Sequence, residues 1–254
     1  FMKKIIKKFI NVLGFDLKRL DPEIKTIDLD ELLKIKLPEN PVIFDVGGNR
    51  GQSIERFNKI FNDPIIHSFE PIKSEFDYMS DRFSKENNIF LNNFALGDKI
   101  EDKEFNITAK TATSSFNKIT EGTKWLKHRS KQYKTSEKEY VVKIEKVKVT
   151  TLDHYCKNKN IQKIDLLKID TQGYEDKVLE GSLNTIKNNH VGVVLTEIIF
   201  DQVYDKHFSF SDIEKYLIPN NFRMVGMNVI NNNIFSGLNF FADVLYFSKK
   251  HHDI

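Results

Sequence analysis

The chain has 254 residues, 40% of them hydrophobic, which is enough for one α/β core or a core with a small appendage. Its 39 lysine and arginine residues nearly balance 36 aspartate and glutamate residues, and the net charge of +3 gives no indication of a nucleic-acid partner. The single cysteine, Cys156, excludes an internal disulfide and most cysteine-based metal sites, so we expect a small buried side chain in a protein of the reducing cytoplasm.

Residues 1–38 are expected to form a basic helical extension ahead of a main domain at residues 39–254. Lysines lie on one side of this predicted amphipathic helix and apolar residues on the other: Ile5, Ile6, Phe9, Ile10, Val12 and Leu13. Packing on the domain or on a partner is favoured, and weak contact with a membrane surface is the alternative. No apolar run is long enough to span a bilayer. Because Phe1 precedes Met2, we expect an expression remnant or an excerpt of a longer protein.

The remainder alternates between strands and helices in the manner of a doubly wound α/β fold. Strands are predicted at residues 42–46, 65–69, 89–94, 164–169, 191–197, 222–227 and 240–247. Helices are predicted at residues 52–61, 73–84, 151–158, 174–188 and 211–218. Only a polar turn at residues 231–233 separates the last two strands, so they should form an antiparallel hairpin at one edge of an otherwise parallel sheet.

An insertion at residues 99–150 interrupts this alternation. Residues 104–107 and 140–149 read as strands, and the second carries charged side chains on one face. Residues 108–136 between them are rich in Thr, Ser and Lys and contain the only tryptophan, Trp125. A polar loop of this length inside a compact domain is typical of a lid or a binding loop, so we expect it to recognise the substrate.

The first strand ends in an acid and a glycine turn, and the second ends in Glu70. The turn contains Asp45, Gly47, Gly48, Asn49 and Gly51, whose register does not fit the pyrophosphate pattern G-x-G-x-x-G. It suits S-adenosylmethionine. Exposed amides would meet the carboxylate of this ligand, Asp45 would compensate its ammonium group or orient the loop, and Glu70 would accept hydrogen bonds from the ribose hydroxyls. The alternative is that the acid and the glycines only cap a helix.

Two later strands also end in acids, Asp170 and Glu197, so two carboxylates should converge on one cleft. Such a pair could deprotonate a hydroxyl or hold a divalent cation, and no third metal ligand is evident. Asp170 is the preferred base, with Glu197 or His207 as alternatives, although a surface-loop role is favoured for His207 taken alone. Lys168, in the same strand as Asp170, reaches the crevice or pairs with an acid.

Several motifs together resemble the FkbM family of S-adenosylmethionine-dependent methyltransferases. They are residues 44–51 (FDVGGNRG), 68–71 (SFEP), 93–98 (NFALGD), 151–153 (TLD), 167–175 (LKIDTQGYE) and 178–181 (VLEG). The resemblance covers about residues 40–248 and implies a class I methyltransferase, with a Rossmann-like, seven-stranded, mostly parallel sheet. By this similarity the turn and Glu70 line the cofactor, Asn93 and Ala95 lie near its adenine, and Ser53 and Pro71 belong to the same site.

The resemblance further implies an O-methyltransferase acting on a hydroxyl, with a sugar, a nucleotide sugar or a polysaccharide precursor favoured. Ser114 and Ser115 match a serine motif of the family's insertion. Gly48 stands where alanine is common, which should be harmless, and Thr171 and Gln172 replace the frequent Val-Glu, which removes an acid beside Asp170. A Rossmann-type oxidoreductase and a non-catalytic nucleoside-binding module are the alternative functions. Oligomeric state is left open, a homo-oligomer included.

Overall fold

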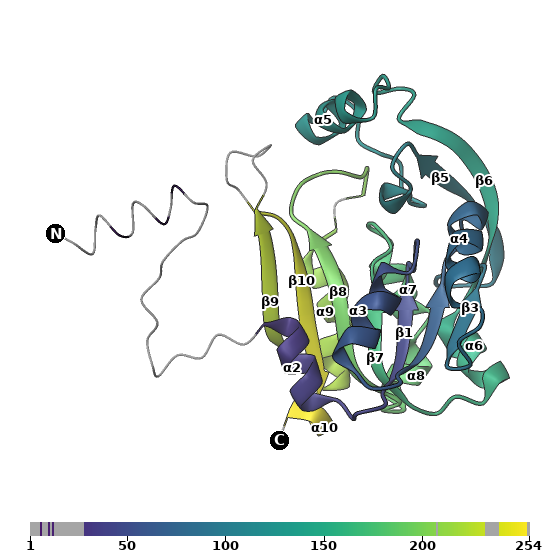
Figure 1. Ribbon diagram of the computed structural model, residues 1–254, viewed down its shortest axis with the longest axis vertical. Coiled ribbons are helices and arrows are strands. Elements are labelled where there is room, and N and C mark those ends of the chain that lie inside the picture. Colours follow the sequence, from purple (N-terminus) through teal and green to yellow (C-terminus); the bar gives the residue numbers. More distant parts are fainter. Residues whose placement is uncertain are drawn as a thin grey trace.

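The structure, a computed structural model, describes residues 28–206, 208–231 and 239–252, together with residues 6, 10 and 12. A seven-stranded sheet in the order β3-β2-β1-β7-β8-β10-β9 forms its centre (Figure 1). The strands are β1 (Val42–Val46), β2 (Ile65–Phe69), β3 (Ile89–Asn92), β7 (Ile164–Ile169), β8 (Val191–Ile199), β9 (Phe222–Asn231) and β10 (Asn239–Ser248). The first five in spatial order are parallel, and β10 is antiparallel to both neighbours. The predicted fold class and edge hairpin are confirmed.

Helices cover both faces of this sheet because neighbouring residues of each buried strand point to opposite sides. Ile43 and Leu166 pack in the cluster that includes side chains of α2 (Leu29–Lys36), α3 (Gln52–Ile60) and α4 (Lys73–Phe83). Phe44 and Leu167 pack in a second cluster with α6 (Leu152–Lys159), α7 (Glu175–Glu180), α8 (Leu183–Lys187) and α9 (Phe210–Leu217). A 3-10 turn, η2 (Ile218–Asn220), follows α9, and α10 (Lys249–His252) follows β10.

The helix predicted at residues 174–188 is two helices, α7 and α8. Gly181 lies between them, and a Cβ atom there would stand 1.9 Å from the carbonyl oxygen of Gly97. The close backbone approach therefore interrupts the periodic apolar pattern that suggested one helix.

Two strands of the insertion and one strand just before it form a separate three-stranded sheet, in the order β4-β6-β5. Its strands are β4 (Ala95–Leu96), β5 (Glu101–Thr108) and β6 (Val141–Thr150). The expectation of an irregular polar loop at residues 108–136 was wrong: this segment contains a 3-10 turn, η1 (Thr111–Thr113), and a helix, α5 (Lys124–Gln132). Trp125 is buried in a cluster with Tyr140, Tyr204 and other apolar side chains. Figure 1 shows α5, β5 and β6 at one end of the large sheet.

The proposed boundary between an extension and the main domain, at residues 38 and 39, stays a prediction. Most of the predicted amphipathic helix lies outside the described residues, whereas α2 contributes Leu29 and Leu33 to the core. Cys156 is buried as expected, and burial raises the pKa of its thiol to about 12. Within the described part of the chain, no helix has the length and apolar character required to cross a membrane.

Candidate active site

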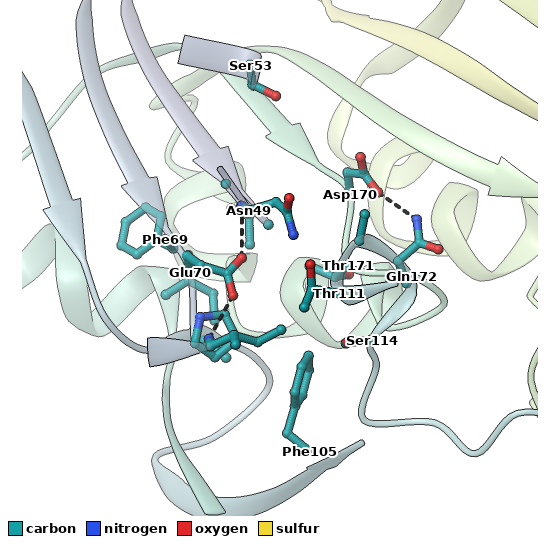
Figure 2. Close-up of a pocket in the computed structure, with 18 of the residues that line it drawn as sticks. Asn49, Ser53, Phe69, Glu70, Phe105, Thr111, Ser114, Asp170, Thr171 and Gln172 are labelled. Carbon is teal, nitrogen blue, oxygen red and sulfur yellow. Dashed lines mark hydrogen bonds between the residues drawn. The ribbon is translucent and has the colours of Figure 1, made fainter. Parts of the chain in front are cut away.

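A cavity of about 300 Å³ lies at the carboxyl ends of β1, β2 and β7 (Figure 2). The order of strands changes direction between β1 and β7, which is where open α/β sheets bind ligands. Most of the predicted cofactor-binding residues line the cavity: Gly47, Gly48, Asn49, Ser53, Glu70, Pro71, Ala95 and Asp170. Asp45, Gly51 and Asn93 are not part of the lining.

Asp45 is turned into the sheet, away from the cavity. Its side chain is fully buried, its Oδ1 atom lies 2.9 Å from Lys168 Nζ, and its Oδ2 atom accepts a hydrogen bond from Ser68 at 2.9 Å. Burial opposes the charge of Lys168, but Asp45 and then Asp170 outweigh it and raise the pKa of the ammonium group. Lys168 itself lines the cavity, whereas Asp45 does not line it and instead contacts Lys168 and Ser68 of the two neighbouring strands.

The glycine turn is held by internal hydrogen bonds. The amides of Gly47 and Gly48 both donate to the carbonyl oxygen of Phe69 at 3.0 Å, so they are not the exposed donors that the sequence suggested. Gly47 has φ +89°, and a Cβ atom there would stand 2.0 Å from the carbonyl oxygen of Asp170. Glycine is therefore required both by the backbone angle and by the approach of β7. Gly51, with φ +84°, precedes the first turn of α3.

Glu70 lies in the cavity wall directly after β2, as predicted. Its two carboxylate oxygens accept hydrogen bonds from the amides of Asn49 at 2.8 Å and Ile72 at 2.7 Å. Burial raises the pKa of Glu70 to about 7, although both amides act in the opposite direction. Asn93 does not face the cavity but donates to the carbonyl oxygens of Glu70 and Pro71, so it fixes the backbone that presents this carboxylate.

The turn after β7 is fastened to the insertion through its backbone. Gln172 and Gly173 both have positive φ angles, 59° and 90°. The side chain of Ser115 donates to the carbonyl oxygen of Gln172 at 2.7 Å, and that of Asn117 donates to the carbonyl oxygen of Gly173 at 2.5 Å. Glu175 accepts hydrogen bonds from the amides of Thr171 and Gly173 from the other side. The turn is thus held from two directions.

This turn places the side-chain amide of Gln172 between the two predicted catalytic acids. Its Nε2 atom donates to Asp170 Oδ1 and to Glu197 Oε1, each at 2.9 Å (Figure 2 shows the first of these bonds). The hydroxyl of Tyr204 donates to Gln172 Oε1 at 3.0 Å and orients the amide. Burial, followed by the charge of Asp170, raises the pKa of Glu197 well above its ordinary value. The two carboxyl groups therefore accept hydrogen bonds from the same amide, and burial disfavours the charged form of Glu197.

Comparison with known proteins identifies the fold and the family. The methyltransferase FkbM domain matches residues 45–224. The chain belongs to this family. Among solved structures, the FkbM methyltransferase of Methylobacillus flagellatus has a TM-score of 0.51 at 11% identity, over 82% of this chain and 44% of the other. The chain therefore spans less than half the length of that protein. No curated protein matches the sequence.

Two further structures contain the expected methyl donor. The Streptococcus pneumoniae protein Sp1610 in complex with S-adenosyl-L-methionine has a TM-score of 0.46 at 9% identity, over 86% of this chain and 71% of that one. Magnesium protoporphyrin IX methyltransferase of Synechocystis, also with this ligand bound, has a TM-score of 0.44 at 10% identity, over 97% of both chains.

The FkbM family membership makes this chain an S-adenosylmethionine-dependent methyltransferase domain. The methyl donor expected from the sequence is therefore the cofactor of the domain, and a Rossmann-type oxidoreductase or a non-catalytic module is not supported. The cavity fits this donor because its lining combines the Glu70 carboxyl group and other polar groups with apolar side chains, including Ile72, Leu96 and Phe105.

A metal site in this FkbM domain is not built from the predicted acids. Within residues 28–206 and 208–252, so far as they are described, no group of three or more His, Cys, Asp or Glu side chains is arranged to hold a metal ion. A cation placed between Asp170 and Glu197 would have to displace the amide of Gln172. His207, the third predicted catalytic residue, lies outside the described residues.

The sequence did not show that the insertion of this FkbM domain lines the cofactor cavity. Its contribution is Phe105, Thr111, Ala112, Ser114 and Phe116. Of the two serines noted in the sequence, Ser114 faces the cavity, and Ser115 fastens the turn at Gln172. The family serine motif was the only local signal for this position, because the other lining residues reach the cavity through the fold of the insertion.

Proposed function

We propose that this FkbM domain is an O-methyltransferase that methylates a hydroxyl of a small polar acceptor, with a sugar, nucleotide sugar or polysaccharide precursor favoured. One observation carries the proposal. Asp170 lines the cofactor cavity and shares the amide of Gln172 with Glu197, which lines a second cavity next to it. A carboxylate that lines the first cavity and is hydrogen-bonded to Gln172, which both cavities share, is suitably placed to accept a proton from a hydroxyl. The sugar acceptor rests on the family resemblance alone.

When bound, S-adenosylmethionine supplies a methyl group on a sulfonium sulfur, which keeps the electron pair of the carbon–sulfur bond as the acceptor oxygen bonds to the methyl carbon. The residues of the chain hold the acceptor in line and exclude water. Asp170 accepts the hydroxyl proton as the new bond forms and releases it to solvent afterwards. Gln172 orients Asp170 through its amide, and Glu70 accepts hydrogen bonds from the ribose hydroxyls.

Glu197 is assigned a different part from Asp170. Because its pKa is raised well above the ordinary value, the neutral carboxyl form is favoured, and a neutral acid is a poor base. We therefore infer that Glu197 contacts the acceptor, whereas Asp170 takes the proton. A cytoplasmic location and a homo-oligomer stay predictions.

The proposal is tested by incubating the full chain with methyl-labelled S-adenosylmethionine and a panel of sugars and nucleotide sugars. We expect one acceptor to gain one methyl group and S-adenosylhomocysteine to accumulate in equal amount. Carbon NMR of the labelled product should place the methyl group on oxygen. Methylation of nitrogen or sulfur acceptors only would show that the O-methyltransferase assignment is wrong, while leaving the family assignment intact.

A further inference from the structure

A second cavity of about 140 Å³ lies beside the cofactor cavity. The two share Ala112 and Gln172 in their linings, so a molecule in the second cavity would stand next to the site of methyl transfer. Lys110 and Arg129 of the insertion provide two cationic groups in its wall, and Glu197 provides one carboxyl group. Aromatic side chains, Trp125 among them, and aliphatic side chains such as Ile199 and Val203 contribute to a mixed lining.

The two cations of this cavity are not neutralised by neighbouring acids. Among the residues that the structure describes, neither Lys110 nor Arg129 forms an ion pair with a carboxylate. The guanidinium group of Arg129 lies 5.9 Å from the centre of the Trp125 ring, and one of its terminal nitrogens donates to Gln132. Its Nε atom is buried and has no hydrogen-bond partner in the described part of the chain. A ligand that places a hydrogen-bond acceptor at this buried donor would satisfy it.

The remaining charged group of the cavity does not remove this excess of positive charge. Glu197 uses one oxygen to accept the amide of Gln172, and its environment favours the neutral carboxyl form. Burial, and then the nearby charge of Arg129, lower the pKa of Lys110, and the opposite effect of Glu197 is smaller than either. The cavity is therefore suited to an anion of more than one negative charge.

We propose that Lys110 and Arg129 bind a phosphate group of the acceptor, so that the substrate of this domain is a phosphorylated compound. The inference rests on the proposed function, because it assigns the acceptor of the same reaction. A phosphate group carries about −1.5 to −2 charges at neutral pH, which matches two cations, and the planar guanidinium group of arginine can bind two of its oxygens. A phosphate held here would leave a neighbouring hydroxyl of the same molecule beside Gln172 and Asp170.

Calorimetry on the full chain saturated with S-adenosylhomocysteine tests the inference, with inorganic phosphate, inorganic pyrophosphate and acetate as probes at low ionic strength. We expect phosphate and pyrophosphate to bind and acetate to bind far more weakly. Lys110→Met and Arg129→Gln should each weaken phosphate binding roughly tenfold. Arg129→Lys, which keeps the charge, should lose less, and thermal unfolding will show that every variant folds.

The matched control is Lys127→Met with Lys131→Gln. Both residues belong to α5 but are exposed and do not line the cavity, so this double variant removes two positive charges, one more than either cavity variant, and should still leave phosphate binding within about twofold. Tighter pyrophosphate than phosphate binding would indicate a diphosphate acceptor, and the reverse a monophosphate. The inference is overturned if the loaded protein does not bind either phosphate probe, if acetate binds equally well, or if the control loses as much as the cavity variants. Absence of S-adenosylhomocysteine binding would instead overturn the proposed function and this inference with it.

Discussion

The part of the site around Glu70 is built from residues close in sequence, whereas the part around Glu197 is assembled from segments far apart. Asn49, Glu70 and Ile72 belong to one βαβ unit, and the amides of Asn49 and Ile72 donate hydrogen bonds to the carboxylate of Glu70. Glu197, Gln172 and Lys110 come from the end of β8, the turn after β7 and the insertion. Under the proposed function, the first group forms the methyl-donor side of the site, and the second forms the acceptor side.

This difference indicates which side sets the chemistry and which sets the substrate. The donor side is fixed by glycines that leave no room for a Cβ atom: the backbone of Asp170 approaches Gly47, and the side chains of Ser68 and Phe83 approach Gly48 and Gly51. It therefore has little freedom to change. The acceptor side combines side chains of the insertion, including Trp125 and Arg129 of α5, with side chains of the large sheet such as Glu197. We infer that the donor side carries the common reaction, and that the acceptor side adapts it to one substrate.

The largest expected effect separates Asp170 from Glu197 on the acceptor side. Asp170→Asn should lower turnover roughly 10²- to 10⁴-fold, the usual contribution of a positioned base, and leave affinity for S-adenosylhomocysteine within a few-fold. Glu197→Gln should lower turnover less than about tenfold, because the neutral amide resembles the protonated carboxyl group that the burial of Glu197 favours. Initial rates and calorimetry measure both quantities. Equal losses of turnover in the two variants would show that Asp170 and Glu197 do not have the separate roles of base and acceptor contact.

Asp45 tests whether the donor side depends on a buried ion pair beneath it. Asp45→Asn would leave Lys168 without its nearest partner in the core and should lower the free energy of unfolding by about 3–5 kcal/mol in urea. Adding Lys168→Met should restore part of the loss. Asp77→Asn, which breaks an exposed pair with Lys73, is the control and should change stability by less than about 1 kcal/mol. If Asp45→Asn is as mild as this control, the donor side does not rest on that pair.

Gly48 tests how tightly the donor side is packed. A Cβ atom there would stand 2.2 Å from the hydroxyl oxygen of Ser68, so Gly48→Ala should lower the free energy of unfolding by about 1–3 kcal/mol. The sequence suggested that glycine in place of the family's alanine is harmless, and the structure shows that Ser68 occupies the space. The double variant Gly48→Ala with Ser68→Ala should be more stable than the sum of its single changes predicts. Strict additivity would contradict this coupling.

The smallest expected effect is a pH dependence on the donor side. Because the pKa of Glu70 is about 7 without ligand, and the carboxylate is the better acceptor for ribose hydroxyls, affinity for S-adenosylhomocysteine should rise between pH 5.5 and 7.5. The rise is at most about tenfold per pH unit. Glu70→Gln should weaken binding and remove most of the slope, while Glu121→Gln, at an exposed residue, should retain it. An unchanged slope in Glu70→Gln would assign the titration to another group.

The difference between the donor side, which is close in sequence, and the acceptor side, which is assembled from distant segments, also determined what could be predicted from sequence. Strands β1, β2 and β7 were predicted at their observed bounds because each is a short apolar run that ends in a polar turn. The position of Glu70 followed from the same pattern. Helix α5 was missed because it is rich in lysine, although Thr123, which accepts a hydrogen bond from the amide of Leu126, is a start signal for a helix.

The link between Gln172 and Glu197 could not be found in this way. It depends on a left-handed backbone at Gln172 and on pairing of β7 with β8, neither of which leaves a local pattern. The direction of the Asp45 side chain is a similar case. A carboxylate at the end of a buried strand can point toward the ligand or toward a neighbouring strand. Asp45 points toward the neighbouring strand because it pairs there with Lys168, which is distant in sequence.

The insertion holds the turn after β7 by its carbonyl oxygens, and this has an evolutionary consequence. Ser115 and Asn117 donate hydrogen bonds to the backbone carbonyl oxygens at positions 172 and 173. These two bonds do not depend on which side chain stands at position 172. A mutation that exchanges glutamate for glutamine at position 172 can therefore change the number of ionisable carboxyl groups in the site while the backbone of the turn stays in place. A single substitution at position 172 is thus enough to give related domains different acid–base chemistry on the same fold.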